Sequence, residues 1–553
     1  MLSNEDPYSQ VCIVSMKTLD GKTEGTASAI LIDSKQGLVL THASVLYPLI
    51  EDCDPERLGK VLNSGSGDKR IFSSSVNIEV TLPNGENGPE DSYFTNDNTI
   101  HPVKLLSNTV QDVKPFIKCK GKFKTIFECR RLTRVLNNLM PSDSWQFVEE
   151  TAATENKQNQ DNKTQTKAQM CYKLLSFFVL IKLQNMYPID NVLMIRDSID
   201  NKVGDLVEIC ATPFGSMSPE VFLNAKSRGI LSNVAGPQGI LLLTDARCVP
   251  GSEGGALFYC HKRKRLLAGI MIASLCWKNN EWVGLSLACA ISEVLGCLKT
   301  HLTHNIDSVK QTDYVGGFDS GFIPELLQKV RCVNVGHNWG SGVVIDSMKG
   351  LILTCSHVLN DVKFSGVSVN DSESSPAQMC NVIYRTPLKS HFDIALIQQK
   401  TCTTTGDEEY PIKFGRAVEG EVMYVIGHAI FRGKGDTLPM VCRGIVSKIV
   451  RHNNVPVMLQ TTCAVHAGAS GGGVFNTRGQ LVALVVCNSK DTVSGAYYPH
   501  VNMCVPIETV ASIIKYFIKT NDADILRSLH VKNNSINRIW SIGTEDCKVY
   551  SPI

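Results

Sequence analysis

Short apolar runs, separated by glycine and polar turns, recur along most of the chain. They include residues 11–16, 29–33 and 37–41 near the N-terminus, and residues 351–354 and 394–397 in the second half. Closely spaced runs of this kind, rich in β-branched side chains, are typical of the strands of a barrel or sandwich. The pattern therefore predicts an all-β protein.

Two stretches show helical periodicity, and three others are polar. Residues 291–299 and 507–518 place their apolar side chains on one face, which predicts a short closing helix at the end of each half. Residues 64–98 carry only weak strand signals and residues 149–169 carry almost no apolar side chain, so we expect insertions, the second of them disordered. Residues 300–322 are polar and aperiodic, which predicts an interdomain linker.

The second half repeats segments of the first. Residues 345–354 resemble residues 32–41, and residues 468–475 resemble residues 251–258. The matched segments are 313 residues apart in the first pair and 217 in the second, so the first copy holds additional residues between them. Because the chain is also too long for one core, we predict tandem domains. The predicted units are a first domain at 1–299, the linker at 300–322, a second domain at 323–520 and a polar C-terminal extension at 521–553.

Composition narrows the class of protein. A formal net charge of +2, with 43% hydrophobic and 20% charged residues, gives no reason to expect nucleic acid or an anionic membrane as a partner. The sequence has no run of about 18 apolar residues, and residues 1–16 lack the apolar core of a secretory signal. The 20 cysteines are irregularly spaced and many lie in apolar runs, as buried free thiols do. We expect a soluble, intracellular, reduced protein.

The clearest candidate for chemistry is the stretch 462–475. Ser470 lies there in the motif Gly-X-Ser-Gly-Gly at 468–472, directly before an apolar Val-Phe pair. Glycines allow a tight turn in which the amides of Gly468 and Ser470, together with that of Ala469, face one small volume. Such amides stabilise an oxyanion while a serine attacks a carbonyl. By itself the motif also fits an ordinary glycine-rich turn.

Two partners for Ser470 lie upstream. His357 follows the apolar run 351–354, and Asp393 directly precedes the apolar run 394–397. A carboxylate at the mouth of a buried strand is costly unless it accepts hydrogen bonds, and orienting an imidazole satisfies it. Each residue alone is more often structural, but the order His, Asp, Ser is that of the chymotrypsin-type triad. We therefore predict His357, Asp393 and Ser470 as catalytic residues.

The first copy lacks these groups. Under the repeat, the counterparts of His357, Asp393 and Ser470 are Ser44, Phe178 and Glu253. The sequence therefore predicts a degenerate, non-catalytic first domain. The alternative is an altered chemistry carried by His42 and Ser252, which lie two positions and one position out of register.

These motifs resemble the three landmarks of trypsin-like serine proteases, and the HtrA-like branch more than the secreted digestive one. In secreted members an acidic residue precedes the serine and receives the new N-terminus on activation, whereas this chain has Ala469 at that place. The whole architecture resembles the peroxisomal processing proteases with a trypsin domain, in which a divergent half precedes a half bearing His, Asp and Ser. The resemblance implies tandem double β-barrels, the first degenerate, and no cofactor or metal.

The resemblance further implies a serine endopeptidase that removes N-terminal leaders carrying the type 2 peroxisomal signal, cleaves some imported matrix enzymes and processes itself. Its implied partners are protein and peptide substrates, with self-association as a further expectation, and its implied location is the peroxisomal matrix. The final residues 551–553, Ser-Pro-Ile, are not a standard peroxisomal signal, which leaves the cytoplasm as the alternative. Ala464, six residues before Ser470, favours a small or apolar side chain before the cut, and His466 is either a pocket residue or a core histidine.

Two other functions stay open at this point. One is a general quality-control protease of the HtrA type, although no recognisable peptide-carboxylate-binding domain follows the second half. The other is a non-catalytic scaffold that binds peptides with a protease fold, for which the degenerate first copy provides a precedent.

Overall fold

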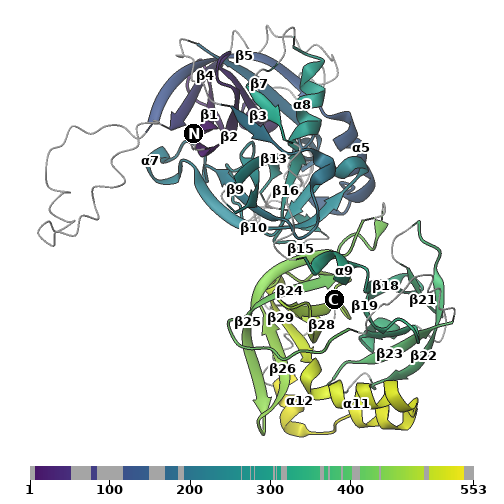
Figure 1. The fold of residues 1–553 in the computed structure, drawn as a ribbon. Helices are drawn as coiled ribbons and strands as arrows, with labels where there is room; N and C mark the ends of the chain where they lie inside the picture. The colour runs from purple at the N-terminus through teal and green to yellow at the C-terminus, as the bar shows by residue number, and fades with distance from the viewer. Residues whose placement is uncertain are drawn as a thin grey trace, which may run out of the picture.

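A computed structural model describes most of the 553-residue chain. The described ranges are 7–51, 76–83, 116–147, 168–184, 192–262, 264–274, 276–278, 281–302, 306, 308–312, 321–360, 366–370, 374–387, 390, 392–400, 412–434, 437–490 and 497–540. They form two units, drawn purple to teal and green to yellow in Figure 1.

The first unit contains two rings of six strands each. The first ring is a closed barrel of β1 (Val11–Thr18), β2 (Glu24–Asp33), β3 (Leu38–His42), β7 (Phe177–Leu183), β5 (Phe116–Glu128) and β4 (Val76–Pro83). The second contains β12 (Ala256–His261), β9 (Leu206–Ala211), β10 (Ala225–Ala235), β11 (Leu241–Thr244), β16 (Ser286–Ala290) and β13 (Lys264–Ala273), closed by the pairing of β12 with β13. The strands β8 (Leu193–Ile195) and β17 (Val309–Gln311) extend its sheet beside β13.

The second unit repeats this arrangement with two closed six-stranded barrels. One contains β18 (Val330–Val335), β19 (Asn338–Asp346), β20 (Leu351–Thr354), β23 (Ala395–Gln399), β22 (Gln378–Arg385) and β21 (Val367–Asn370). The other contains β24 (Val422–Gly427), β25 (Met440–His452), β26 (Val455–Thr461), β29 (Tyr497–Pro506), β28 (Leu481–Lys490) and β27 (Gly473–Asn476). The prediction of an all-β protein with tandem double barrels is confirmed.

Helices are short and lie at the ends of the barrels. The α-helices are α1 (Tyr47–Glu51), α5 (Arg130–Leu139), α7 (Pro219–Phe222), α8 (Ile291–Lys299), α9 (Ile323–Leu327), α11 (Ile507–Thr520) and α12 (Asn534–Trp540). The 3-10 helices are η1 (Pro7–Gln10), η2 (Ala43–Leu46), η3 (Ser198–Asp200), η4 (Pro237–Gly239), η5 (His357–Leu359) and η7 (Ala523–Leu529). The two predicted closing helices correspond to α8 and α11, whereas α5 was missed despite buried positions at a helical spacing.

The structure adds detail to three predicted segments. The first predicted insertion contains β4, which pairs with β1 and β5 and so closes a barrel. The predicted linker contains β17, which pairs with β8 of the first unit. The predicted extension packs on the second unit, because Leu526 and Trp540 are buried in its core. Polarity concealed β17, none of whose residues is buried, whereas β4 was missed although Ile78, Val80 and Leu82 are buried. Nearly all of the second predicted insertion, and residues 551–553, lie outside the described ranges.

One apolar cluster contains residues of both units, among them Leu243 of β11 and Met423 of β24. Asp245 lies at their junction, where Oδ1 accepts the Ile230 amide and Oδ2 accepts the Arg443 amide, each at 2.8 Å. Asn233 Nδ2 donates to Leu438 O at 2.9 Å. β10 of the first unit therefore lies against β25 of the second.

Two further features bear on the expected class. No helix within the described ranges has the length and hydropathy needed to span a membrane. All cysteines in those ranges are free thiols, most of them buried.

Candidate active site

The turn before β27 positions Ser470. Gly468 and Gly471 have φ angles of +91° and +82°, which side chains with a Cβ rarely adopt. A Cβ on Gly471 would lie 2.1 Å from Ser341 O. The Ser341 amide also donates to Ser470 O at 2.7 Å. The glycines are therefore required both by the turn and by its close approach to β19.

His357 and Asp393 form a pair, as predicted. His357 begins η5, separated from the end of β20 by two residues, and its Nδ1 hydrogen-bonds an Asp393 carboxylate oxygen. The His357 amide donates to the other oxygen at 3.0 Å. The side chains are largely buried, with exposed fractions of 13% and 14%. The carboxylate is thus satisfied at the strand mouth, and it fixes the orientation of the imidazole.

Ser470 lies on a turn next to this pair, but its hydroxyl does not hydrogen-bond His357 Nε2. Ser470 Oγ donates to Val486 O at 2.9 Å. His357 Nε2 is buried and has no hydrogen-bond partner in the described part of the chain. A Cβ on Gly340 would lie 2.6 Å from the Val358 side chain and 2.9 Å from Ser470 O, so η5 and the serine turn are adjacent. The Ser–His hydrogen bond of a working triad is therefore not formed in this structure.

Backbone hydrogen bonds exclude one of the three predicted oxyanion donors. The Ala469 amide donates to His466 O at 2.9 Å, so it is engaged within the turn. Within the described ranges, the Gly468 amide has no hydrogen-bond partner. Of the three predicted donors, Gly468 and Ser470 therefore stay as candidates, and Ala469 does not fit.

One residue that sequence analysis missed holds the turn in place. Ser341 Oγ donates to Gly468 O and accepts the His428 amide, each at 2.7 Å. Ser28 makes the equivalent contacts in the first copy, with Gly251 O and the Thr212 amide, each at 2.8 Å. Extending the repeat upstream would have found this pair of serines, which are 313 residues apart like the other early matches.

The first copy keeps the turn and fills it with a carboxylate. Gly251 and Gly254 have φ angles of +94° and +81°, matching the glycines around Ser470. Glu253, at the serine position, accepts the Gly251 amide at 2.9 Å and the Ser274 amide at 3.1 Å. Gly251 is the counterpart of Gly468. The carboxylate therefore occupies the amide that would bind an oxyanion in a working copy.

The strand register corrects one counterpart. Thr41 pairs with Val179 in the first barrel, as Thr354 pairs with Ala395 in the second unit. Asp393 is therefore equivalent to Phe177, not to Phe178. Spacing along the chain could not detect a shift of one residue, because only the hydrogen-bonded ladder defines equivalence here.

The other candidate residues of the first copy are Ser44, His42 and Ser252, and their contacts are typical of structural residues. Ser44 lies in η2, and its buried hydroxyl has no hydrogen-bond partner in the described part of the chain. His42 Nδ1 accepts the Ser44 amide at 3.3 Å, and its ring packs edge-on against Phe178 at 5.8 Å. Burial lowers the pKa of His42 to about 4. The Ser252 amide is engaged with Val249 O at 3.1 Å. These contacts favour a structural role for His42 and Ser252 over an altered chemistry.

Glu253→Ala should leave peptide hydrolysis nearly unchanged, because the contacts of this carboxylate are with Gly251 and Ser274 of the first copy and not with the second half. It should still lower the free energy of unfolding by about 1–3 kcal/mol, because the Gly251 and Ser274 amides lose their acceptor. The measurements are kcat/KM on a peptide and the midpoint of unfolding, with Glu253→Gln as the control that retains an acceptor. Complete loss of hydrolysis in a folded Glu253→Ala protein would contradict this expectation.

His466 is a buried neutral histidine beside the serine turn. Its exposed fraction is 8%, and its Nε2 has no hydrogen-bond partner in the described ranges. Burial, and then His500 and Lys278 nearby, lower its pKa to about 3. The structure therefore supports the core interpretation, while leaving the Nε2 atom unsatisfied.

His466 should make the protein less stable in acid. The folded pKa lies below the ordinary 6.5, so the unfolded chain binds more protons between these values, and stability is lost as the pH falls from 6.5 towards 3. One such group contributes about 1 kcal/mol per pH unit. His466→Gln should flatten the fall in unfolding midpoint relative to the wild type. Exposed His337→Gln is the control, and equal slopes for all three proteins would refute the assignment.

One group of side chains near the triad has metal-ligand types. Single ligand atoms of Cys355, His357 and Asp393 lie within 4.8 Å of one another. Burial, and then the nearby Asp393 charge, raise the pKa of the Cys355 thiol well above its ordinary value. Cys355 Sγ also donates to Val485 O at 3.1 Å. A protonated thiol is a poor ligand, so the contacts fit a hydrogen-bonded His–Asp pair better than a metal site.

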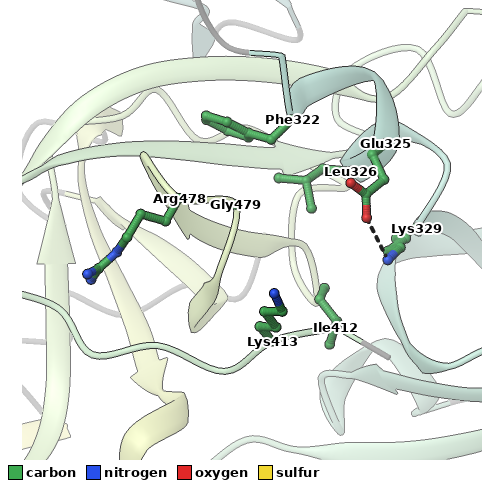
Figure 2. A pocket seen from close by; sticks show the side chains of 8 residues that line it. All are labelled: Phe322, Glu325, Leu326, Lys329, Ile412, Lys413, Arg478 and Gly479. Carbon is green, nitrogen blue, oxygen red and sulfur yellow. Dashed lines mark hydrogen bonds and ion pairs between the residues drawn. The ribbon is translucent and has the colours of Figure 1, made fainter. Parts of the chain in front are cut away.

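A separate cavity of about 240 Å³ lies between α9 and the turn after β27 (Figure 2). Its lining includes Glu325 and Lys329, whose charged groups are 3.0 Å apart, with Lys413 and Arg478 opposite. No triad residue lines it. It is therefore distinct from the candidate active site.

Comparison with known proteins points to the same type of site as the geometry does. Residues 340–484 match the family described as trypsin-like peptidase domain. This part of the second half is thus similar in sequence to trypsin-like peptidase domains. The matched range includes the positions of His357, Asp393 and Ser470, and the predicted resemblance to trypsin-like and HtrA-like proteases is confirmed.

Two relatives align with a longer part of this chain than the family match does. The peroxisomal leader peptide-processing proteases of Homo sapiens and Mus musculus are 35% and 36% identical over 347 residues, covering 60% of this chain and 59% of each relative. The periplasmic serine endoprotease DegP of Escherichia coli K12 is 32% identical over 150 residues, covering 26% of this chain and 29% of DegP. The chain thus spans about 59% of the length of the first two relatives.

Among solved structures, the HtrA-type protease AlgW with tripeptide matches with a TM-score of 0.29 and 18% sequence identity, covering 36% of this chain and 63% of AlgW.

Proposed function

We propose that this chain is a serine endopeptidase whose second half performs the chemistry. The observation that carries the proposal is the His357–Asp393 pair, held beside a serine turn whose Gly468 amide is not engaged. The match of residues 340–484 to trypsin-like peptidases supports it.

In the proposed mechanism, Ser470 attacks the scissile carbonyl after its hydroxyl rotates from Val486 O towards His357 Nε2. His357 accepts the serine proton and then donates it to the leaving amine. Asp393 holds the tautomer with Nδ1 protonated and stabilises the imidazolium. The Gly468 and Ser470 amides stabilise the oxyanion, and water then hydrolyses the acyl-enzyme.

For specificity, we propose that a small or apolar side chain precedes the cut. Ala464 is buried, with an exposed fraction of 3%, and offers no charge to pair with Arg or Lys. His466 is neutral and buried near Ala464, so it adds no cation for an acidic side chain.

For substrates, we propose leader-bearing peroxisomal proteins, with processing of some matrix enzymes and self-cleavage, in the peroxisomal matrix. The support is the identity to two proteins named peroxisomal leader peptide-processing protease. Self-association and the cytoplasm as an alternative location stay open hypotheses.

The substrate proposal is tested by incubating purified protein with a precursor carrying a type 2 leader and, separately, with unfolded casein. Cleavage of the precursor at one site, with casein left intact, is the expected result. Indiscriminate digestion of casein would instead favour a quality-control protease. The matched control is the same precursor without its leader, which should not be cut.

A further inference from the structure

A small sheet of the first half lies at the junction of the two units (Figure 1). It contains β15 (Glu281–Trp282), β14 (Trp277–Lys278) and β6 (Trp145–Gln146). β15 lies beside β29 of the second half. The sheet belongs to the degenerate copy by sequence, but it contacts the copy that bears the triad.

Lys278 reaches from this sheet into the second half. Its ammonium donates to Ile430 O. It also lies 5.8 Å from the ring centroid of Trp145 and 5.7 Å from that of Trp339. Trp145 stacks against Phe431, with centroids 6.1 Å apart. Because aromatic faces attract a cation, these rings hold the ammonium on the Ile430 carbonyl.

The loop that Lys278 holds is conformationally strained. Ile430 has a φ of +64°, a left-handed conformation that is rare for a β-branched residue and costs about 1–3 kcal/mol. Its amide donates to Ala467 O at 3.0 Å. Such a conformation persists only where surrounding contacts over-determine it, and Lys278 provides one of those contacts.

Ala467 leads directly into the proposed oxyanion turn. A Cβ on Gly468 would lie 2.3 Å from Trp339 Nε1 and 2.6 Å from His428 O, so the turn is packed tightly against these groups. Trp339 Nε1 donates to His428 O at 3.1 Å. A continuous series of contacts therefore runs from the first half to the Gly468 amide.

The same segment is supported from a second direction. The Trp282 ring lies 6.0 Å from that of His500, and a Cβ on Gly284 would lie 3.1 Å from His500 Nε2. Pro499 O, next to His500, accepts the Val465 amide at 2.9 Å. The first half thus contacts both the loop at Ile430 and the segment 499–500, and each of these hydrogen-bonds residues 465–468.

We propose that the degenerate half is an intramolecular activator, and that Lys278 is the positioning residue through which it orients the Gly468 amide. The proposal rests on the serine-protease function above. Ala469 provides no carboxylate by which the second half could anchor this turn to a cation of its own. Because the Gly468 amide acts while Ser470 is acylated, we expect the first half to raise the rate of that step. It does not contact the substrate in this proposal.

Lys278→Met tests this role, because it removes the donor and the charge but keeps the side-chain length. We expect kcat for a fluorogenic peptide, and the rate of Ser470 modification by a fluorophosphonate, to fall about 10- to 100-fold. This is less than the loss of about 10²- to 10³-fold on deleting an oxyanion donor outright. KM should change by less than about twofold, because ground-state binding does not use the oxyanion donors.

Lys278→Arg keeps the donor and the charge and should restore most of the rate. Lys299→Met, an exposed lysine at the end of α8, is the matched control and should behave as the wild type. Unfolding midpoints establish that each variant is folded. If Lys278→Met does not fold, Lys278→Gln, which keeps a neutral donor, should show an intermediate kcat.

The outcomes separate the two proposals. Failure of the wild-type protein to form a Ser470-dependent adduct would refute the protease function itself. If the wild type reacts and a folded Lys278→Met or Lys278→Gln protein reacts at the same rate, only the positioning role is overturned. A loss confined to KM would overturn it as well, since it would indicate a substrate contact.

Discussion

Ser470→Ala is expected to abolish peptide hydrolysis, with a fall in kcat of about 10⁶-fold. The reason is that Ser470 is the nucleophile in the proposed mechanism, and the His357–Asp393 pair has no other hydroxyl to activate in that turn. The variant should also fail to form a fluorophosphonate adduct. Loss of one side-chain hydrogen bond, that to Val486 O, should lower the free energy of unfolding by only about 1 kcal/mol.

Ser252→Ala is the matched control for that experiment. Ser252 occupies the glycine turn of the first copy, is equally buried and adjoins Glu253. Its removal should leave both hydrolysis and labelling at the wild-type level. Adduct formation by Ser470→Ala at an unchanged rate would show that another residue is the nucleophile, and loss of labelling in Ser252→Ala would place chemistry in the first half.

Asp393→Asn should lower kcat by about 10⁴-fold while leaving the fold intact. The amide replaces a carboxylate oxygen that accepts from His357 Nδ1 with a group that donates. The imidazole would then present its proton on Nε2, towards the serine, and could not act as a base. Steady-state kinetics on a peptide provide the measurement, and rates at raised pH should recover little of the loss.

The control for Asp393→Asn is structural. One carboxylate oxygen also accepts the His357 amide at 3.0 Å, so the asparagine must keep that contact with its carbonyl oxygen. An unfolding midpoint close to that of the wild type shows that it does. A variant with nearly wild-type kcat would exclude Asp393 from the mechanism and favour the non-catalytic scaffold.

The strand pattern predicted the fold well because strands in these barrels are short, apolar and bounded by turn residues. β20 and β23 were visible in this way, and with them the places of His357 and Asp393. The segments that contain β4 and β17 were harder to recognise from the sequence. β17 has no buried residue and β4 lies within a mostly polar stretch, so both strands depend on pairing with strands that are distant in the sequence.

The candidate site was likewise only partly predictable from the sequence. Sequence order was enough to select His357, Asp393 and Ser470, because each lies in a local motif whose residue types suit one role. It was not enough to exclude the Ala469 amide or to find the register of Asp393 against Phe177. Those facts depend on backbone hydrogen bonds, which residue types do not specify.

The sequence alone determined the duplicated all-β architecture, the loss of the nucleophile at Glu253 and the identity of the candidate triad. Only the tertiary structure showed that Glu253 occupies its own oxyanion turn, and that Lys278 reaches the loop behind Gly468. The physical reason is that periodicity and motifs report residue types along the chain, whereas these contacts depend on how a turn folds back on itself, for Glu253, and on how one double barrel packs on the other, for Lys278.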